Sequence, residues 1–369
     1  MNKIIVLSSN TSWYIYNFRS STIRALISNG YDVHCISPYD RYTHLLINEL
    51  GAKWHEVKID NKGSNPFNDL KFFYNLCILF FKLKPKFVLN FTVKNNIYGT
   101  FSAKFFGARV INNVSGLGTA FIRKNITTLV VKLLYKLSQP LADVVFCQNE
   151  DDFDFLIQQN LVSYRKLRLL PGSGVCINKF SPHLKTKRED KKIRFLFVGR
   201  MLKDKGIIEL VMANNVLISE GYDFSLTLCG GIDTKNSSSL SEDELKNFCL
   251  NSNIRWIGNC DNMPSVYAES DCIVLPSYRE GLPRTLLEAG AMGLPSVTTN
   301  VPGCKHVIEN DFNGFICNVK DHLSLAKAMK RVLELSDDEY ARLSINSRER
   351  VVERFDENIV VKKTLEVIL

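Results

Sequence analysis

Residues 277–293 read SYREGLPRTLLEAGAMG and directly follow the apolar run DCIVLP at 271–276. The apolar run predicts a buried strand, and residues 285–292 strongly favour a helix. Gly281 and Pro283 mark the turn between them, and proline suits the first turn of a helix because its missing N–H would be unbonded there. The stretch therefore predicts a strand, a short turn and a helix.

The start of this helix is a candidate phosphate site. The backbone N–H groups of Leu282, Arg284 and Thr285 would point out of the helix N-terminus, which attracts phosphate through its free donors and partial positive charge. Glu280 precedes the helix, and Glu288 lies about one turn into it. A phosphate flanked by two carboxylates suits a sugar nucleotide, with one carboxylate for sugar hydroxyls and one for the ribose diol. An ordinary strand–loop–helix crossover explains the spacing about as well.

The segments LPSYREGLPRTLLEAGAMGLPSV at 275–297 and PGCKHVIENDFNGFI at 302–316 contain an E-x7-E pattern from Glu280 to Glu288. Both segments resemble the retaining glycosyltransferases of family 4. The resemblance implies an α/β fold of the GT-B type, with two facing Rossmann-like domains and a cleft between them. It also implies a nucleotide-sugar donor, here a UDP-sugar of the hexose or N-acetylhexosamine type, and no cofactor or metal.

A second motif, GRMLKDKG at 199–206, follows the predicted strand 193–198. In the family, a similar motif places an arginine and a lysine on the donor diphosphate, which implies this role for Arg200 and Lys205. A bidentate arginine and a lysine point charge can stabilise the charge that develops on a leaving diphosphate. With Glu280 on the donor sugar, these three residues are the catalytic candidates. Solvated surface cations are the alternative interpretation.

The remaining donor-side candidates follow other strands of the second half. Gly230 follows the strand 224–229 and would leave room for a ligand, and the backbone around Trp256 and Ile257 resembles the family segment that contacts the nucleotide base. A buried structural role for Trp256 is the alternative. The remaining donor-side candidates are Gly199, Gly281 and Pro283.

The N-terminal half alternates strands and helices, which predicts a parallel sheet whose ligands bind beyond the carboxyl ends of the strands. The segments FTVKNNIYG at 91–99 and NNVSGLG at 112–118 resemble a subset of family 4 that builds bacterial surface polysaccharides such as capsule and O-antigen. Candidate acceptor-side residues in these loops and in the first one are Asn10, Lys94, Asn96, Gly116 and Gly118. Many family members carry a histidine near this region, but no histidine occurs between His55 and His183, so its role is not transferred.

The net charge of +9 indicates an anionic partner, and the dispersed basic residues disfavour nucleic acid. The segment NPFNDLKFFYNLCILFFKLKPK at 65–86 combines many apolar residues with lysines, which suits either a membrane interface or a core helix. A second basic and apolar patch spans 122–137. We therefore expect a lipid-pyrophosphate-linked acceptor of the undecaprenyl type at an anionic membrane surface, on the cytoplasmic side.

Other sequence features favour a cytoplasmic enzyme without a metal. The start MNKIIVLSSN lacks a signal-peptide pattern, and no apolar run reaches about 18 residues. The ten cysteines lack metal or disulfide spacing, and we expect reduced thiols. The DFD at 152–154 could suggest a metal site, but acidic residues also favour a helix start.

We expect four segments along the chain. An acceptor-binding domain covers 1–180, a polar linker 181–192 and a nucleotide-sugar-binding domain 193–355, while a last helix at 356–369 crosses back to the first domain. The predicted function is transfer of a sugar to a hydroxyl of the lipid-linked acceptor. A nucleotide-sugar 2-epimerase of the same fold and a non-catalytic binding partner are the alternatives.

Overall fold

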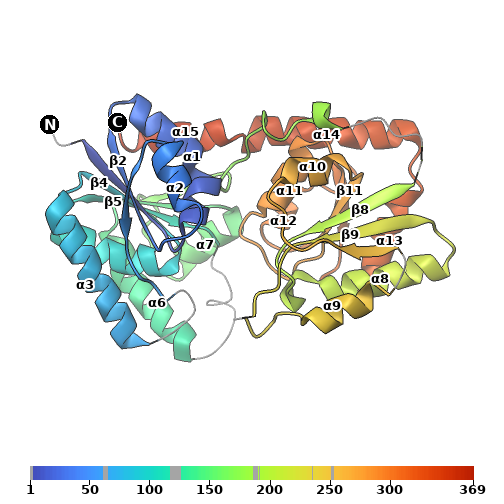
Figure 1. Ribbon diagram of the computed structural model, residues 1–369, viewed down its shortest axis with the longest axis horizontal. Helices are drawn as coiled ribbons and strands as arrows, with labels where there is room; N and C mark the ends of the chain where they lie inside the picture. Colours follow the sequence, from blue (N-terminus) through green and yellow to red (C-terminus); the bar gives the residue numbers. More distant parts are fainter. Residues whose placement is uncertain are drawn as a thin grey trace. The chain divides into compact units, whose positions relative to one another are not determined.

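The computed structural model describes residues 3–60, 65–116, 126–185, 190, 192–234, 236–250 and 253–369. The chain divides into two compact units (Figure 1). The first comprises Met1–Ser173 and Glu357–Leu369, and the second comprises Gly174–Asp356. Each unit is an all-parallel sheet covered by helices, which is the Rossmann-like α/β class that the sequence predicts.

The first unit contains a seven-stranded parallel sheet in the order β3-β2-β1-β4-β5-β6-β7. Its strands are β1 (Ile4–Ser8), β2 (Asp32–Ser37), β3 (Lys53–Glu56), β4 (Phe87–Phe91), β5 (Arg109–Val114), β6 (Val144–Cys147) and β7 (Leu167–Leu169). The order reverses direction between β1 and β4, and a crevice for ligands forms at such a switch point. The loops after β1 and β4 are therefore the expected binding edge of this unit.

Helices cover both faces of the first sheet (Figure 1). One face carries α1 (Ser12–Ser28), α2 (Thr43–Asn48) and α15 (Glu357–Glu366). The other face carries α3 (Pro66–Leu83), α4 (Thr100–Phe105), α6 (Ile126–Ser138) and α7 (Glu150–Gln158), with short turns η1 (Asn95–Gly99) and η2 (Gln139–Leu141). Two separate apolar clusters, one on each face, form the core of this unit.

The second unit contains a six-stranded parallel sheet in the order β10-β9-β8-β11-β12-β13. Its strands are β8 (Ile193–Val198), β9 (Phe224–Cys229), β10 (Ile254–Trp256), β11 (Cys272–Leu275), β12 (Ser296–Thr299) and β13 (Gly314–Cys317). Its helices and turns are η3 (Pro182–Leu184), η4 (Lys203–Lys205), α8 (Ile207–Ser219), α9 (Glu242–Phe248), α10 (Met263–Ala268), α11 (Arg284–Ala291), α12 (Cys304–Val307), α13 (His322–Leu333) and α14 (Asp337–Phe355). The switch point of this sheet lies between β8 and β11.

The division between the units falls earlier than the predicted boundary at residue 180. Val175 and Phe180 are buried in the core of the second unit, and the backbone N–H of Val175 donates to the carbonyl of Phe355 at 2.9 Å. Turn η3, inside the predicted linker 181–192, packs on α10 of the second unit. The buried side chains of Val175 and Phe180 therefore attach residues 174–180 to the second unit.

Candidate functional site

The switch point of the second sheet brings together two of the motifs. The segment 199–206 leaves the carboxyl end of β8, and the segment 276–281 leaves that of β11, the neighbouring strand. The backbone N–H of Tyr278 donates to the carbonyl of Asp204 at 3.0 Å and fastens the two segments together. Residues that are more than seventy positions apart thereby share one edge of the sheet.

Lys205 and Glu280 form a direct ion pair at this edge. Their side chains are only 22% and 13% exposed, so solvent screens the pair less than it would a surface pair. Gly206, at φ 74°, lets the start of α8 lie against Pro276, because a Cβ there would be 2.1 Å from the Pro276 carbonyl oxygen. The close approach that this glycine permits holds Lys205 beside Glu280.

Glu288 lies on α11 and has two partners. Its Oε1 accepts from Arg284 Nε at 2.9 Å, and its Oε2 accepts from the Tyr267 hydroxyl at 3.0 Å. Helix α11 begins one residue earlier than the predicted 285, and Pro283 is its N-cap rather than part of its first turn. Pro283 supplies no side-chain hydrogen bond, so the helix N-terminus has no side-chain cap from it.

The other residues of this loop lie around the helix start. Gly281 and Leu282 are half-buried, and the Leu282 side chain packs against the core. Thr285 is half-buried as well, and its carbonyl lies 3.3 Å from the Tyr267 hydroxyl. The predicted phosphate-facing residues are thus gathered at one end of α11.

Arg200 has a partner of its own rather than joining the Lys205–Glu280 pair. Its Nη1 donates to Asp233 Oδ2 at 2.9 Å, and its side chain is 57% exposed. Asp233 follows β9, the strand next to β8. Arg200 therefore lies at the same sheet edge with its guanidinium open to solvent.

Three donor-side predictions take a different form in the structure. The missing side chain of Gly230 serves packing, because a Cβ there would lie 1.8 Å from the Gly199 carbonyl oxygen. Trp256 is half-buried against the core, and its indole N–H donates to the Gly230 carbonyl at 2.8 Å. The backbone N–H of Ile257 bonds the Leu228 carbonyl at 3.0 Å, so sheet pairing occupies a donor expected for the base.

The acceptor-side candidates lie on neighbouring loops of the first sheet. Asn10 follows β1, Lys94 and Asn96 follow β4, and Gly116 follows β5, and these three strands are adjacent. Gly118 lies outside the described residues. The topology therefore gathers the described candidates at one edge, next to the switch point.

Two of these side chains face inward rather than toward a ligand. Lys94 Nζ lies 2.5 Å from Asp69 Oδ1 of α3, and both side chains are largely buried. Asn96 is buried, and its Nδ2 donates to the Asn113 carbonyl at 2.9 Å. The acceptor-side candidate Lys94 is thus paired with an aspartate that lies 25 positions earlier in the chain.

Sequence reasoning missed Ser277 and Tyr267, which bond the two carboxylates. Ser277 Oγ donates to Glu280 Oε1 at 2.6 Å, and both Ser277 and Tyr267 are buried. Ser277 stands three residues before Glu280, a spacing that can signal a local side-chain bond. Nothing in the sequence links Tyr267 to Glu288.

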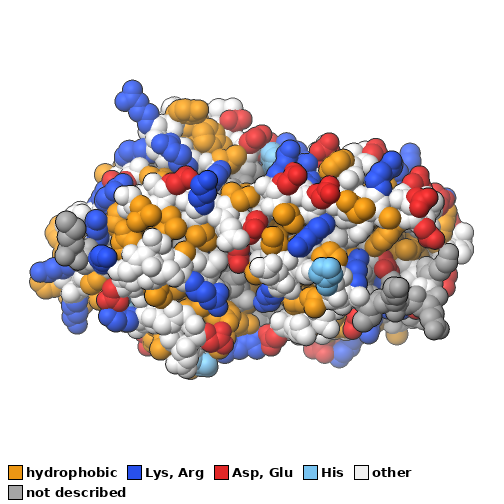
Figure 2. Space-filling model, turned by 90° about the horizontal axis from the view of Figure 1, so that it is seen from above, with side chains coloured by type: hydrophobic (Ala, Val, Ile, Leu, Met, Phe, Trp, Pro, Cys, Tyr) orange, Lys and Arg blue, Asp and Glu red, His pale blue; other side chains and the backbone are white. Residues whose placement is uncertain are grey.

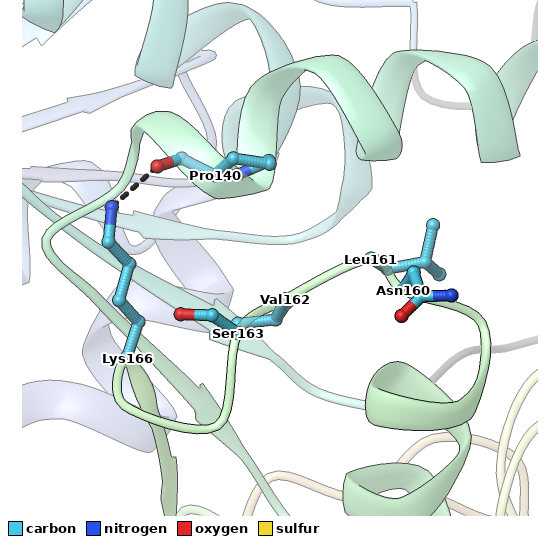
Figure 3. A pocket seen from close by; sticks show the side chains of 6 residues that line it. All are labelled: Pro140, Asn160, Leu161, Val162, Ser163 and Lys166. Carbon is cyan, nitrogen blue, oxygen red and sulfur yellow. Dashed lines mark hydrogen bonds between the residues drawn. The ribbon is translucent and has the colours of Figure 1, made fainter.

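Two pockets lie apart from the ion pair. One of about 430 Å³ is in the first unit, where Lys166 Nζ donates to the Pro140 carbonyl at 2.5 Å (Figure 3). Another of about 380 Å³ is lined by residues such as Arg194, Thr227 and Ile257 at β8–β10. Among the predicted site residues, Ile257 is the one that lines either of these two pockets.

The electrostatic character of the surface is mixed. On the face shown in Figure 2, lysine and arginine side chains are scattered among acidic and apolar ones. Glu150, Asp151 and Asp152 form the first turn of helix α7, where Asp152 accepts from Asn149 Nδ2 at 3.1 Å. In the part of the chain that the structure describes, no group of three potential ligands could hold a metal ion.

Two family models match the two units. Residues 3–149 match the model described as "Glycosyl transferase 4-like", and residues 181–350 match "Glycosyl transferases group 1". The fold is that of solved glycosyltransferases: a protein from Rickettsia africae superposes with a TM-score of 0.79 at 20% identity, over 99% of this chain and 97% of its own. The Anabaena protein HepE, solved with UDP and glucose, gives 0.80 at 15% identity, over 100% and 99%.

Curated relatives cover most of the chain. An N,N'-diacetylbacillosaminyl-diphospho-undecaprenol α-1,3-N-acetylgalactosaminyltransferase of Campylobacter jejuni is 28% identical, over 96% of this chain and 95% of its own length. The capsular polysaccharide glycosyltransferase CapM of Staphylococcus aureus is 29% identical over 92% and 90%. A UDP-Gal:α-D-GlcNAc-diphosphoundecaprenol α-1,3-galactosyltransferase of Escherichia coli is 26% identical over 78% and 76%.

Fold and family models together define a glycosyltransferase of the GT-B class. The chain belongs to glycosyltransferase family 4, with a 4-like domain followed by a group 1 domain, as the resemblance of residues 275–316 implies.

Proposed function

We propose that this enzyme transfers a hexose or N-acetylhexosamine from a UDP-sugar to a hydroxyl of a lipid-pyrophosphate-linked glycan in surface-polysaccharide assembly. The observation that carries the proposal is the Lys205–Glu280 ion pair at the switch point, with Glu288 on the next helix. A cation and two carboxylates at one edge match a diphosphate, sugar hydroxyls and a ribose diol. The names of the Campylobacter jejuni and Escherichia coli relatives specify a sugar linked to undecaprenol through a diphosphate. The name of the Escherichia coli relative also specifies UDP-Gal.

The proposed chemistry retains the anomeric configuration and needs no metal or other cofactor. The bond from the anomeric carbon to the diphosphate breaks, and a bond from that carbon to the acceptor oxygen forms on the same face. The departing phosphate oxygen takes the acceptor proton, so no protein base is required. Arg200 and Lys205 would stabilise the charge that accumulates on UDP.

The donor assignment is tested by thermal shift and saturation-transfer NMR against UDP-sugars and GDP-sugars. We expect one UDP-sugar to stabilise the protein. Glu280→Ala should lower the affinity for that UDP-sugar roughly tenfold, because the substitution removes a hydrogen-bond acceptor for the sugar hydroxyls. Glu220→Ala, which breaks an exposed ion pair with Lys330 in the same unit, is the matched control. Absence of any nucleotide response would refute the donor site, and a free epimerised nucleotide sugar among the products would favour the epimerase.

We also propose that the enzyme works at an anionic membrane surface, the inner face of the cell membrane, through helices α3 and α6. Helix α3 buries Phe72, Leu76 and Phe80 in the core, so the core-helix interpretation accounts for one of its faces. Its opposite face leaves Phe67 and Phe81 80% and 62% exposed. Exposed Leu70, Tyr74 and Ile78 continue this apolar face between them.

Helix α6 extends the same kind of surface. Leu129, Leu133 and Leu137, at helical spacing, are 69%, 56% and 55% exposed. Both helices pack on one apolar cluster on the same face of the sheet (Figure 1), and both contact turn η1.

The charges beside the exposed apolar faces of α3 and α6 indicate an anionic partner. Lys71 and Lys82 on α3 are exposed, and Lys136 on α6 is exposed as well. Helix α6 contains no acidic residue, and the one on α3, Asp69, is paired with Lys94. Apolar side chains flanked by lysines suit anionic lipid, where each lysine adds about 1 kcal/mol of attraction. Among the described helices, none is long and apolar enough to cross a membrane.

Vesicle flotation tests this surface. The protein should float with vesicles containing phosphatidylglycerol and not with purely phosphatidylcholine vesicles, and salt should weaken the binding. Phe67→Ser with Phe81→Ser should reduce binding at least roughly tenfold, because two aromatic rings no longer enter the interface. Leu250→Ser, at a comparably exposed residue of the second unit, is the control. Equal loss in the control, or no flotation of the unaltered protein, would contradict the proposal.

A further inference from the structure

Each of the two donor-side carboxylates receives a hydrogen bond from a buried hydroxyl outside helix α11. Ser277 Oγ donates to Glu280 Oε1 at 2.6 Å, and the Tyr267 hydroxyl donates to Glu288 Oε2 at 3.0 Å. Ser277 and Tyr267 are both fully buried. Neither hydroxyl is therefore available to a substrate, and each acts on the site through its carboxylate.

The bonds to Glu280 fall on a single oxygen. Lys205 and Ser277 both bond Oε1, and no residue in the described ranges bonds Oε2. Two charge-assisted bonds to the same atom restrict where Oε1 can lie. The oxygen Oε2 is thereby left as the acceptor for hydroxyl groups of a donor sugar.

The surroundings of Tyr267 make it a permanent donor. Its ring packs edge-on against Phe180 at 5.9 Å, and burial together with the nearby Glu288 raises the pKa of its hydroxyl well above the ordinary value. The hydroxyl stays protonated and donates to Glu288, while Arg284 holds the other oxygen. Two donors from different elements thus fix the Glu288 carboxylate.

We propose that Ser277 and Tyr267 are positioning residues with separate duties. Ser277 orients Glu280 toward the sugar of the donor, and Tyr267 orients Glu288 toward the ribose diol. The inference rests on the proposed function, since it assigns each hydroxyl to one part of a UDP-sugar.

Affinity measurements with three ligands separate the two duties. The probes are UDP, the UDP-sugar selected by the thermal-shift panel, and 2′,3′-dideoxy-UDP, which lacks the diol. Ser277→Ala should lower the affinity for the UDP-sugar roughly tenfold and change the affinity for UDP by less than about twofold, because only the sugar would contact Glu280. Tyr267→Phe should lower the affinities for UDP and for the UDP-sugar alike, roughly tenfold, and leave the affinity for 2′,3′-dideoxy-UDP unchanged.

Matched controls exist for both substitutions. Ser296→Ala removes the hydroxyl of a buried serine on the neighbouring strand β12, and this hydroxyl has no hydrogen-bond partner among the described residues. Tyr135→Phe removes a buried phenol hydroxyl in the first unit. Neither control should change the affinity for any of the three ligands by more than about twofold.

The outcomes distinguish this inference from the proposed function. If Ser277→Ala lowers the affinities for UDP and the UDP-sugar equally, or changes neither affinity, Ser277 does not orient Glu280 for the sugar. If Tyr267→Phe lowers the affinities for all three ligands equally, or for none of them, Tyr267 does not orient Glu288 for the ribose diol. Failure of the unaltered protein to bind UDP or any UDP-sugar would instead overturn the proposed function.

Discussion

Gly206 stands at the start of helix α8 and shows how much one residue controls at the donor edge. Its left-handed backbone and its closeness to Pro276 exclude a side chain, and the residue before it is Lys205. The motif GRMLKDKG names Lys205 as a candidate, but the contact with Pro276 depends on packing between β8 and β11. A sequence lists such residues without the distances that join them, which is also why Tyr267 was missed.

Gly206→Ala should destabilise the protein by roughly 1–3 kcal/mol or more, because it adds a left-handed alanine and a clash with the Pro276 carbonyl. Gly221→Ala at the other end of the same helix is the control, since φ is 89° there and nothing lies within 4 Å of a Cβ. Urea unfolding of both variants measures the difference. Equal losses would mean that the backbone conformation alone, and not the contact with Pro276, demands glycine.

At the scale of elements, the alternation of apolar strands and amphipathic helices predicts the structure well. The bounds of β8 and β9 match the predicted strands 193–198 and 224–229, since apolar runs are local signals. The segment 91–99 is different: the sequence predicts a loop, and the structure forms the π-helical turn η1. Ser8 Oγ bonds Asn95 Oδ1 at 2.7 Å across 87 positions, and such tertiary bonds have no local signature.

The contact of helix α4 with strand β5 contains an acid-sensitive group. Asp143 Oδ2 accepts from Lys104 Nζ at 2.6 Å and from the Val110 backbone N–H at 2.7 Å. Burial alone would raise the pKa of Asp143, but the bonds from Lys104 and Val110 outweigh it and leave the pKa below its ordinary value. A lowered folded-state pKa stabilises the protein above the unfolded-state pKa, and this contribution is lost as the pH falls through the folded-state pKa.

Asp143→Asn should therefore lower the free energy of unfolding at pH 7, and the difference from the unaltered protein should shrink as the pH falls below about 4. Urea unfolding between pH 7 and pH 3 measures it. Asp311→Asn, at an exposed ion pair with Arg331, serves as the control and should have little effect because surface pairs contribute little. A constant difference at all pH values would show that the charge of Asp143 is not the cause.

At the scale of the whole molecule, the donor-side candidates all belong to one continuous segment. Residues 174–356 contain them, together with a six-stranded sheet and its own core cluster. The first unit is discontinuous, because α15 packs on α1 and contributes Val360 to its core. Sequence patterns predict two Rossmann-like halves, but the placement of 174–180 depends on where Val175 and Phe180 become buried.

We expect the fragment 174–356 to fold alone and to bind UDP within about threefold of the full chain, because a segment of this size buries its own core. Circular dichroism melting and UDP titration measure both properties. The complementary fragment 1–173, which lacks α15, should melt at a lower temperature than the same unit in the full chain. An unfolded 174–356 fragment would contradict the division into independent units.

The return of α15 to the first unit also orders events on the ribosome. Synthesis proceeds from the N-terminus, so the first unit lacks α15 until residues 357–369, which follow the whole second unit, have been made. Until α15 arrives, the side of α1 that it contacts stays open to water. The half of the enzyme that is translated first is therefore finished last, and nascent chains should offer chaperones an apolar strip on α1 for most of their synthesis.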